Sequence, residues 1–279
     1  MNLELDGRVA LVSGCSQGLG YACVRTLARH GADIFGVSIG DDSALKKEVE
    51  ALGRSYHSLT VSLTTPGSIH DVMKEVLAAY GHVDILLNFA GILKKEDTLE
   101  ISRQAFQSAL DINVTAAFTL SQEVIRQFIR QGHGGKIINA SGILPYGTSE
   151  YCAYFTSKGA VEAMTKYMAH EFAGRDIQIN AITLGFMNEG NRLQSGDGQN
   201  DDLSVLKEIP AGRWSASCTL QCCRELHQWC LHPTGWRLQY LMLCRNGLLS
   251  IPFFISHSKN IATTHTRNKP ISNTSSRVR

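Results

Sequence analysis

Residues 9–20, Val-Ala-Leu-Val-Ser-Gly-Cys-Ser-Gln-Gly-Leu-Gly, join a short apolar run to a glycine-rich turn at the start of a helical pattern. This order predicts a strand, a tight turn and a helix N-terminus, whose backbone N–H groups can hold a pyrophosphate. A tight turn that binds nothing is the alternative interpretation. The turn residues that we expect to contact a dinucleotide are Gly14, Ser16, Gln17, Gly18, Leu19 and Gly20.

The alternation of apolar runs and helical patterns continues to residue 216. It predicts an α/β fold, a single Rossmann-like, doubly wound parallel sheet with helices on both faces. The expected strands are Val9–Ser13, Asp33–Val37, His57–Leu63, Asp84–Ala90, Lys136–Ser141 and Gln178–Thr183. The expected helices cover residues 18–30, 42–52, 67–80, 103–131 and 152–173. Ligands of such sheets bind at the carboxyl ends of the strands, which hold Gly14, Ala90, Ser141 and Gly185.

A second motif lies in the helix expected over residues 152–173. Tyr154 and Lys158 are four residues apart and therefore share one helix face. A lysine in that position can lower the pKa of a phenol, so that the tyrosine exchanges a proton near neutral pH. An ordinary buried tyrosine and a solvated lysine are the alternative. The preceding glycine turn, and Ser141 thirteen residues before Tyr154, favour the chemical interpretation.

These motifs stand in the order found in the short-chain dehydrogenase/reductase family, which the chain resembles through most of its length. Ser13 occupies the threonine position of that family's T-G-x-x-x-G-x-G turn. The segment Asn88-Phe89-Ala90-Gly91 stands where the family usually has Asn-Asn-Ala-Gly. The resemblance implies an NAD(P)-dependent oxidoreductase that interconverts a secondary alcohol and a ketone by hydride transfer.

The resemblance also implies roles for four catalytic residues. Tyr154 would exchange the proton of the substrate oxygen, and Lys158 would lower the pKa of Tyr154 and bind the nicotinamide ribose. Ser141 would hydrogen-bond the substrate carbonyl or hydroxyl group, and Asn113 would hold a water molecule in a proton relay. A strand-ending serine and a helix-capping asparagine are the alternatives. Further cofactor contacts are implied at Asn88, Ala90, Gly91, Tyr154, Lys158 and Gly185, and no metal is implied.

The choice of cofactor depends on the end of the second strand, where a carboxylate would bond the ribose 2′-hydroxyl of NAD. This position holds Ser38, and neither the next residues nor Gln17 supplies a base to pair with a 2′-phosphate. NAD is therefore expected, with NADP less favoured. The family's adenine-contacting aspartate corresponds to Ser62, a change that would weaken adenine recognition.

Within the family, several segments resemble the bacterial 2-deoxy-D-gluconate 3-dehydrogenases, also described as 2-dehydro-3-deoxy-D-gluconate 5-dehydrogenases. These segments are Gly14-Cys15, Ala51–Arg54, Gly81–Leu86, Gly134–Asn139 and Ile209–Trp214. The resemblance implies a sugar-acid substrate. The planar guanidinium of Arg213 is suited to its carboxylate, and a surface arginine after a turn is the alternative.

The composition indicates a cytoplasmic protein with reduced thiols. Eight cysteines accompany no secretory signal, and no apolar run approaches the length of a membrane span. A net charge of +2 gives no indication of a nucleic-acid or membrane partner. We expect a small-molecule hydroxy or keto substrate and, if the fold is intact, a homo-oligomer.

The chain changes character near Trp214. Residues 217–279 carry eight basic residues and one acidic residue, Glu225, whereas residues 1–216 carry a net charge of −5. We therefore divide the chain into a family domain, 1–216, and an atypical basic, cysteine-rich tail, 217–279. The tail is expected to be disordered or translated out of frame, because a shift of one base forces glycines at Trp229 and Trp236 with the spacing of the family's ending. The last strand would then be missing and the strand at 178–183 would have an unpaired edge.

Two other interpretations follow from this tail. A chain that lacks its last strand would be a truncated, non-enzymatic isoform that retains a nucleotide-binding fold, and the absence of turnover with NAD would distinguish it from an enzyme. Alternatively, the tail would bind zinc or, through its basic residues, nucleic acid, although the spacing fits no standard zinc finger. The residues available to zinc are Cys218, Cys222, Cys223, His227, Cys230 and His232.

Overall fold

The computed structural model describes residues 4–142, 149–184, 216–219, 243–244 and 247–248. The chain divides into two compact units, Met1–Gly235 and Trp236–Arg279. The strands of the first unit are β1 (Val9–Ser13), β2 (Asp33–Ser38), β3 (Tyr56–Thr60), β4 (Ile85–Asn88), β5 (Gly135–Gly142), β6 (Ile177–Leu184) and β7 (Ala216–Thr219). Its α-helices are α1 (Gly18–Arg29), α2 (Ser43–Ala51), α3 (Ser68–Tyr80), α4 (Arg103–Leu110), α5 (Ala116–Gln131) and α6 (Cys152–Phe172). The second unit contains an antiparallel pair, β8 (Leu243–Cys244) and β9 (Gly247–Leu248).

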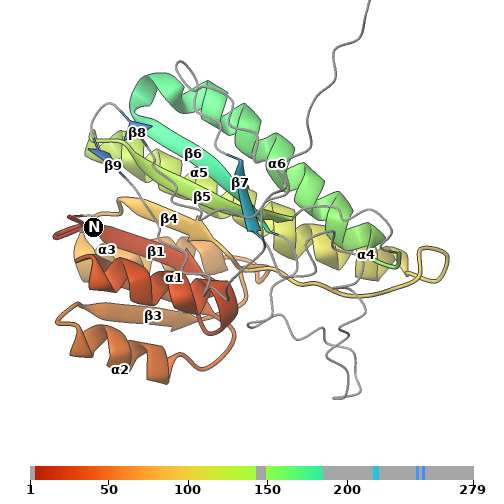
Figure 1. The fold of residues 1–279 in the computed structure, drawn as a ribbon, viewed down its shortest axis with the longest axis horizontal. Helices are drawn as coiled ribbons and strands as arrows, with labels where there is room; N and C mark the ends of the chain where they lie inside the picture. Colours follow the sequence, from red (N-terminus) through yellow and green to blue (C-terminus); the bar gives the residue numbers. More distant parts are fainter. Residues whose placement is uncertain (1–3, 143–148, 185–215, 220–242, 245–246, 249–279) are drawn as a thin grey trace, which may run out of the picture. The chain divides into compact units, whose positions relative to one another are not determined.

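The first unit is built around one sheet of seven strands in the order β3-β2-β1-β4-β5-β6-β7 (Figure 1). The six strands from β1 to β6 run parallel, and this confirms the predicted Rossmann-like α/β fold. The strand order reverses between β1 and β4. Open parallel sheets bind their ligands at such a switch point, beyond the carboxyl ends of the strands.

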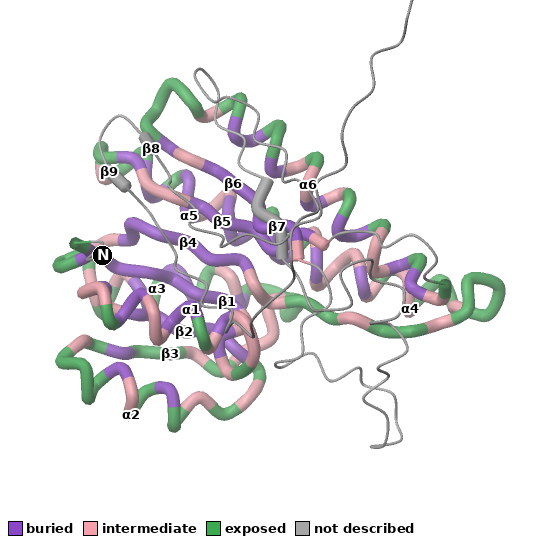
Figure 2. Tube along the Cα trace, in the orientation of Figure 1, coloured by how far each residue is buried: buried purple, intermediate pink, exposed green. Residues whose placement is uncertain are grey.

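Helices cover both faces of the sheet, and β1 is therefore buried along its whole length (Figure 2). Val9 and Leu11 belong to a core cluster that draws on α3, α5 and α6. Because alternate residues of a strand point to opposite faces, Ala10 and Val12 face the other layer, where α1 packs on β1 and β2 (Figure 1). This double burial explains why the sequence of β1 is continuously apolar rather than alternating.

The predicted elements are present, with ends that differ by a few residues, except for the helix expected over 103–131. That segment contains α4 and α5 joined by a π-helical turn, Asp111–Thr115. The buried side chain of Asn113 in this turn bonds the backbone of the segment after β4, so tertiary contacts accompany the break. The strand predicted over His57–Leu63 covers only Tyr56–Thr60.

The edge of β6 differs from the expectation of an unpaired strand. Ala216–Thr219 forms β7, which pairs antiparallel with residues 181–184 of β6. Half of β6 is thus covered by a four-residue strand. The expected loss of the family's last parallel strand, and the expected disorder or frame change of residues 217–279, concern residues that lie largely outside the described part of the chain. The predicted boundary between residues 216 and 217 falls within β7 and stays a prediction.

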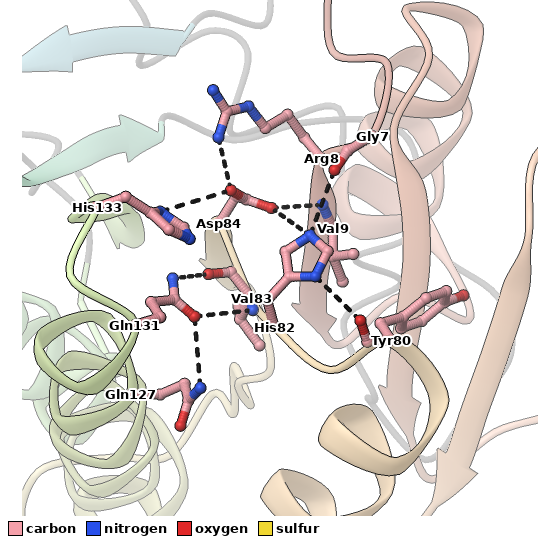
Figure 3. A network of polar contacts seen from close by, with 10 residues as sticks. All are labelled: Gly7, Arg8, Val9, Tyr80, His82, Val83, Asp84, Gln127, Gln131 and His133. Carbon is pink, nitrogen blue, oxygen red and sulfur yellow. Dashed lines mark hydrogen bonds and ion pairs between the residues drawn. The ribbon is translucent and has the colours of Figure 1, made fainter.

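A polar network fixes the amino end of the sheet, away from the switch point (Figure 3). Asp84, buried at the start of β4, accepts hydrogen bonds from Arg8 Nη1 at 2.8 Å and from the backbone N–H of Val9 at 2.9 Å. The rings of His82 and His133 lie 3.2 and 4.0 Å from its carboxylate oxygens. One carboxylate therefore joins the starts of β1 and β4 to the turn between α5 and β5.

No helix within the described residues is long and apolar enough to cross a membrane. The expected cytoplasmic location stays a prediction.

Candidate functional site

The glycine turn between β1 and α1 is too tight for side chains at two positions. Gly14 has a φ of +73°, and a Cβ atom there would lie 2.6 Å from the backbone nitrogen of Ala90. A Cβ atom on Gly20 would lie 2.1 Å from the carbonyl oxygen of Gly14. The first glycine therefore lets β1 approach the segment after β4, and the last one closes α1 onto the turn.

The N-terminus of α1 is suited to an anion. Its N-cap residue, Gln17, makes no side-chain capping bond, and its first turn contains no acidic residue. In α4, by contrast, the Ser102 hydroxyl accepts a hydrogen bond from the backbone of Ala105 at 3.1 Å. The free N–H groups and positive dipole end of an uncapped helix favour a phosphate. The residues of the turn thus fit the pyrophosphate of a dinucleotide.

Ser13 links the ends of β1 and β4, a role that the sequence analysis did not assign. Its hydroxyl oxygen accepts hydrogen bonds from the backbone nitrogens of Phe89 and Ala90 at 3.2 and 3.3 Å. The same hydroxyl donates to the carbonyl of Leu87 at 3.3 Å. The sequence offered one indication of this role, because Ser13 occupies the threonine position of the family's glycine motif. Ser13 therefore keeps the glycine turn and the Ala90–Gly91 segment together.

The polar side chains of the loop after β2 are hydrogen-bonded within the protein. The Ser38 hydroxyl donates to the carbonyl of Gly40 at 2.9 Å, and the Asp41 carboxylate accepts from the backbone and hydroxyl of Ser43 at 3.0 Å. These hydrogen bonds from Ser43 lower the pKa of Asp41. Asp42 accepts a 2.7 Å hydrogen bond from the hydroxyl of Tyr56. Both carboxylates of the loop are thus already engaged, and the loop contributes no cation.

The structure describes only some of the other residues predicted to bind cofactor, substrate or zinc. The Asn88 side chain is buried and donates to Ser121 Oγ and Asn139 Oδ1, both at 2.8 Å, so that it braces β4 against α5 and β5. The NH2 group of its amide is therefore used within the protein, whereas its buried Oδ1 has no hydrogen-bond partner among the described residues. Ser62 follows β3, and its hydroxyl lies 2.9 Å from that of Thr64. Gly185 lies outside the described residues, as do Arg213 and all the tail residues considered for zinc except Cys218, of which only the backbone is described.

The predicted serine, tyrosine and lysine meet at the carboxyl end of β5. Ser141 is fully buried, and its hydroxyl donates to the carbonyl of Lys158 at 3.1 Å. The Lys158 ammonium donates to the carbonyl of Ala140 at 2.7 Å. The Tyr154 hydroxyl lies 3.4 Å from the position that a Cβ atom on Gly142 would occupy. The end of strand β5 and the first turns of helix α6 therefore supply the three side chains to one place.

A short path of backbone connects this cluster to the glycine turn. Gly14 is in close contact with Ala90, as described above, and Gly91 follows directly. A Cβ atom on Gly91 would lie 2.9 Å from Asn113 Oδ1 and 3.6 Å from Lys158 Nζ. The turn suited to a pyrophosphate and the lysine of α6 thus flank the same two residues after β4.

Comparison with known proteins identifies the family. The sequence model described as short chain dehydrogenase matches residues 8–199, which is more than half of the chain. The chain belongs to the short-chain dehydrogenase family. A 2-dehydro-3-deoxy-D-gluconate 5-dehydrogenase of Dickeya dadantii is 39% identical over 219 residues, which cover 78% of this chain and 87% of the relative. The resemblance seen in the sequence is confirmed, and this short-chain dehydrogenase is an oxidoreductase whose homologues act on CH–OH groups.

Solved structures of the family agree with the fold. An NAD+-bound xylitol dehydrogenase superposes with a TM-score of 0.68 at 27% identity, over 76% of this chain and 88% of that one. A putative NAD(P)-dependent gluconate 5-dehydrogenase from Beutenbergia cavernae, with bound NADP, gives a TM-score of 0.69 at 30% identity, over 77% and 86% of the two chains. The family uses NAD(P), and these similar proteins hold either form.

Burial dominates the electrostatics of Tyr154 and Lys158 in this short-chain dehydrogenase. It raises the pKa of Tyr154 to about 12 and lowers the pKa of Lys158 to about 8. The Lys158 nitrogen lies 5.6 Å from the centroid of the tyrosine ring. The lowered tyrosine pKa expected from the sequence is therefore not present in this arrangement, because both groups are withdrawn from water. Near neutral pH, Tyr154 is a phenol that holds a transferable proton.

The buried lysine should make the stability of the protein depend on pH. Its pKa falls from 10.5 to about 8 on folding, so the unfolded chain binds more protons between these values and stability rises with pH across this window. We expect Lys158→Met to be more stable relative to the wild type below pH 8 than at pH 10.5, by about 3 kcal/mol. Urea unfolding at both pH values measures this difference.

The exposed Lys166 on the same helix provides the control for this prediction. Lys166 forms a surface pair with Glu162 at 3.0 Å, and such pairs contribute little. Lys166→Met should therefore show no comparable change between the two pH values. If the gap between Lys158→Met and the wild type is the same below pH 8 and at pH 10.5, Lys158 is not a desolvated cation.

Proposed function

We propose that this short-chain dehydrogenase interconverts a secondary alcohol and a ketone on a sugar acid, with NAD(H) as the preferred cofactor and Tyr154 as the acid/base. The observation that carries the proposal is the convergence of the glycine turn and Lys158 on Ala90 and Gly91, with Tyr154 one turn before Lys158 on the same helix. A dinucleotide laid from the turn toward Lys158 would bring its reactive end close to Tyr154. The named activities of the relatives support the choice of a sugar acid.

Three residues of the chain would have distinct roles in the reaction. Bound NAD(H) would take up or supply the hydride. Tyr154 would give its phenolic proton to the substrate oxygen in reduction, where its raised pKa keeps the proton in place until negative charge develops. The Ser141 hydroxyl oxygen would accept a hydrogen bond from a substrate hydroxyl group, and its hydrogen must turn from the carbonyl of Lys158 to bond a ketone. Lys158 would place positive charge beside both groups and bind the nicotinamide ribose.

The preference for NAD follows from the groups around Ser38. Position 17 holds Gln17, and the loop from Ser38 to Asp42 contains no lysine or arginine to pair with a 2′-phosphate. Ser16 lies close to Gly40, since a Cβ atom on Gly40 would be 3.0 Å from its hydroxyl oxygen. Neutral hydroxyl groups and two carboxylates surround this part of the loop, a setting unfavourable to a phosphate dianion.

The test begins with the purified full-length chain and a fluorescence titration with NADH and with NADPH. We expect saturable binding that is tighter for NADH. Turnover with NAD and 2-dehydro-3-deoxy-D-gluconate is then followed by NADH absorbance, with xylitol as a control that lacks the carboxylate. Faster turnover of the sugar acid supports the proposal. Binding without turnover of either compound supports the alternative, a non-enzymatic isoform with a nucleotide-binding fold, and the absence of binding contradicts both.

Assembly into a homo-oligomer stays a prediction. The exposed apolar residues of the two long helices agree with it: Phe118 and Ile129 on α5 are 41% and 42% exposed, and Tyr167 on α6 is 75% exposed.

A further inference from the structure

Ser157 lies between Tyr154 and Lys158 on α6. It is fully buried, directly before Lys158 and one turn after Tyr154. Its hydroxyl donates to the carbonyl of Tyr154 at 2.6 Å and accepts a hydrogen bond from Asn113 Nδ2 at 2.8 Å. A serine hydroxyl has a single hydrogen, so this arrangement uses its donor on the helix and leaves its lone pair for Asn113.

The amide of Asn113 is fully used by its neighbours. Besides its bond to Ser157, Nδ2 donates to the carbonyl of Ile92 at 3.0 Å, and Oδ1 accepts from the backbone nitrogen of Ile92 at 2.8 Å. The N–H and C=O groups of Ile92 leave only one orientation for the amide, since a flipped side chain would face like groups. Ser157 is therefore the contact through which this amide is attached to α6.

The hydrogen bond between Asn113 and Ser157 affects Lys158 through Gly91. Asn113 Oδ1 and the Lys158 ammonium both lie beside Gly91, 2.9 and 3.6 Å from the position that its missing Cβ atom would occupy. If the amide of Asn113 turns away from α6, the Gly91–Ile92 backbone loses the support that keeps it against Lys158. Because Lys158 is buried, such a movement would admit water to the ammonium.

We propose that Ser157 is a positioning residue for Lys158, because it holds Asn113 on α6 and thereby keeps the Gly91–Ile92 backbone packed beside the lysine. The inference rests on the proposed function for its effect on catalysis. It assigns to the side chain of Asn113 a clamping role, in addition to the water-holding role that the resemblance implies. Ser157 itself touches neither substrate nor cofactor in this scheme.

The first test is a double-mutant cycle in the full chain. Ser157→Ala leaves a buried N–H of Asn113 without its acceptor, and we expect kcat to fall about 10-fold to 100-fold with little change in the substrate KM. Asn113→Ala should lower kcat at least as much. If Ser157 acts through Asn113, the double variant is no slower than Asn113→Ala alone.

The matched control is Ser108→Ala on α4. The Ser108 hydroxyl also donates to a carbonyl of its own helix, that of Gln104 at 2.9 Å, so this variant removes the same local bond away from the cluster. Its kcat should stay that of the wild type. If Ser157→Ala does not fold, Ser157→Cys replaces it, because the thiol fills the volume but is a weak acceptor; an intermediate loss of kcat is then expected.

A second readout needs no turnover. In the wild type, stability should rise between pH 8 and pH 10.5, and this rise should disappear in Lys158→Met. It therefore reports the burial of the lysine. In the Ser157→Ala background this lysine-dependent rise should shrink, because water reaches the ammonium. An inactive wild type would contradict the proposed function alone, since this measurement still decides the role of Ser157. Effects of Ser157→Ala and Asn113→Ala that multiply, or an unchanged lysine-dependent rise, would overturn the inference.

Discussion

Tyr154→Phe is expected to lower kcat by about 10²-fold to 10⁴-fold, the usual contribution of a general acid or base. The change removes one hydroxyl group, while the ring keeps its edge-to-face contact with Phe155 at a centroid distance of 5.1 Å. The stability of the fold and the affinity for NADH should therefore be nearly unchanged. Steady-state kinetics, together with the NADH titration, separates a loss of chemistry from a loss of binding.

The raised pKa of Tyr154 gives this prediction a direction in pH. With a pKa of about 12 in the absence of cofactor, the phenol is protonated near neutrality and ready to donate in reduction. Oxidation needs the phenolate, so its rate should increase as the pH rises toward that value, and Tyr154→Phe should abolish this increase. Tyr167→Phe, on the exposed face of the same helix, is the control. Wild-type turnover in Tyr154→Phe would exclude this tyrosine as the proton donor.

The sequence was sufficient to predict the part of the fold that depends on local pattern. A continuous apolar run such as Val9–Val12 indicates a strand buried on both faces, and the glycine that ends the strand, Gly14, has a positive φ and close contacts. Both features are determined by neighbouring residues in the chain. The family motifs also point to Ser141, Tyr154 and Lys158, which lie together at the carboxyl end of β5; their catalytic roles stay predictions.

Contacts between residues distant in the sequence could not be predicted from local pattern. Nothing in the sequence near Asp111 predicts a π-helical turn, because the segment 103–131 has continuous helical periodicity. The turn becomes understandable only when the Asn113 amide is seen to bond Ile92 and Ser157, which lie 21 and 44 residues away. The importance of Ser157 has the same origin, since serine is common in helices and carries no motif signal of its own.

The electrostatics were also not predictable from spacing. Two residues four apart on a helix suggest a cation that lowers the pKa of a phenol. In the structure the lysine donates to Ala140 and both groups are buried, so desolvation outweighs their mutual effect. A group that pairs with the lysine ammonium, such as a ribose hydroxyl, would change this balance. Activation of Tyr154 is then a property of the complex rather than of the free protein.

Gly14→Ala is expected to abolish NADH binding and to destabilise the fold by about 2–5 kcal/mol. Part of this cost is the positive φ of +73°, which disfavours alanine by about 1–2 kcal/mol. The rest comes from contact, because the new Cβ atom would lie 2.6 Å from the backbone nitrogen of Ala90 and 2.7 Å from the carbonyl carbon of Phe89. These are backbone atoms, so relief requires β1 and β4 to separate at the switch point.

Gly53→Ala separates the two costs. Gly53 has a φ of +74°, and no heavy atom lies within 4 Å of the position that its Cβ atom would occupy. The two variants therefore share the conformational penalty and differ only in the close approach. Urea unfolding should show the smaller loss for Gly53→Ala, with wild-type NADH affinity. Equal losses of unfolding free energy in the two variants would mean that the close approach of Gly14 to Ala90 is dispensable. A larger loss for Gly14→Ala, together with abolished NADH binding, would show that the contact between β1 and β4 shapes the cofactor site. The same contact supports Gly91 and the lysine, so the turn contributes to both halves of the site.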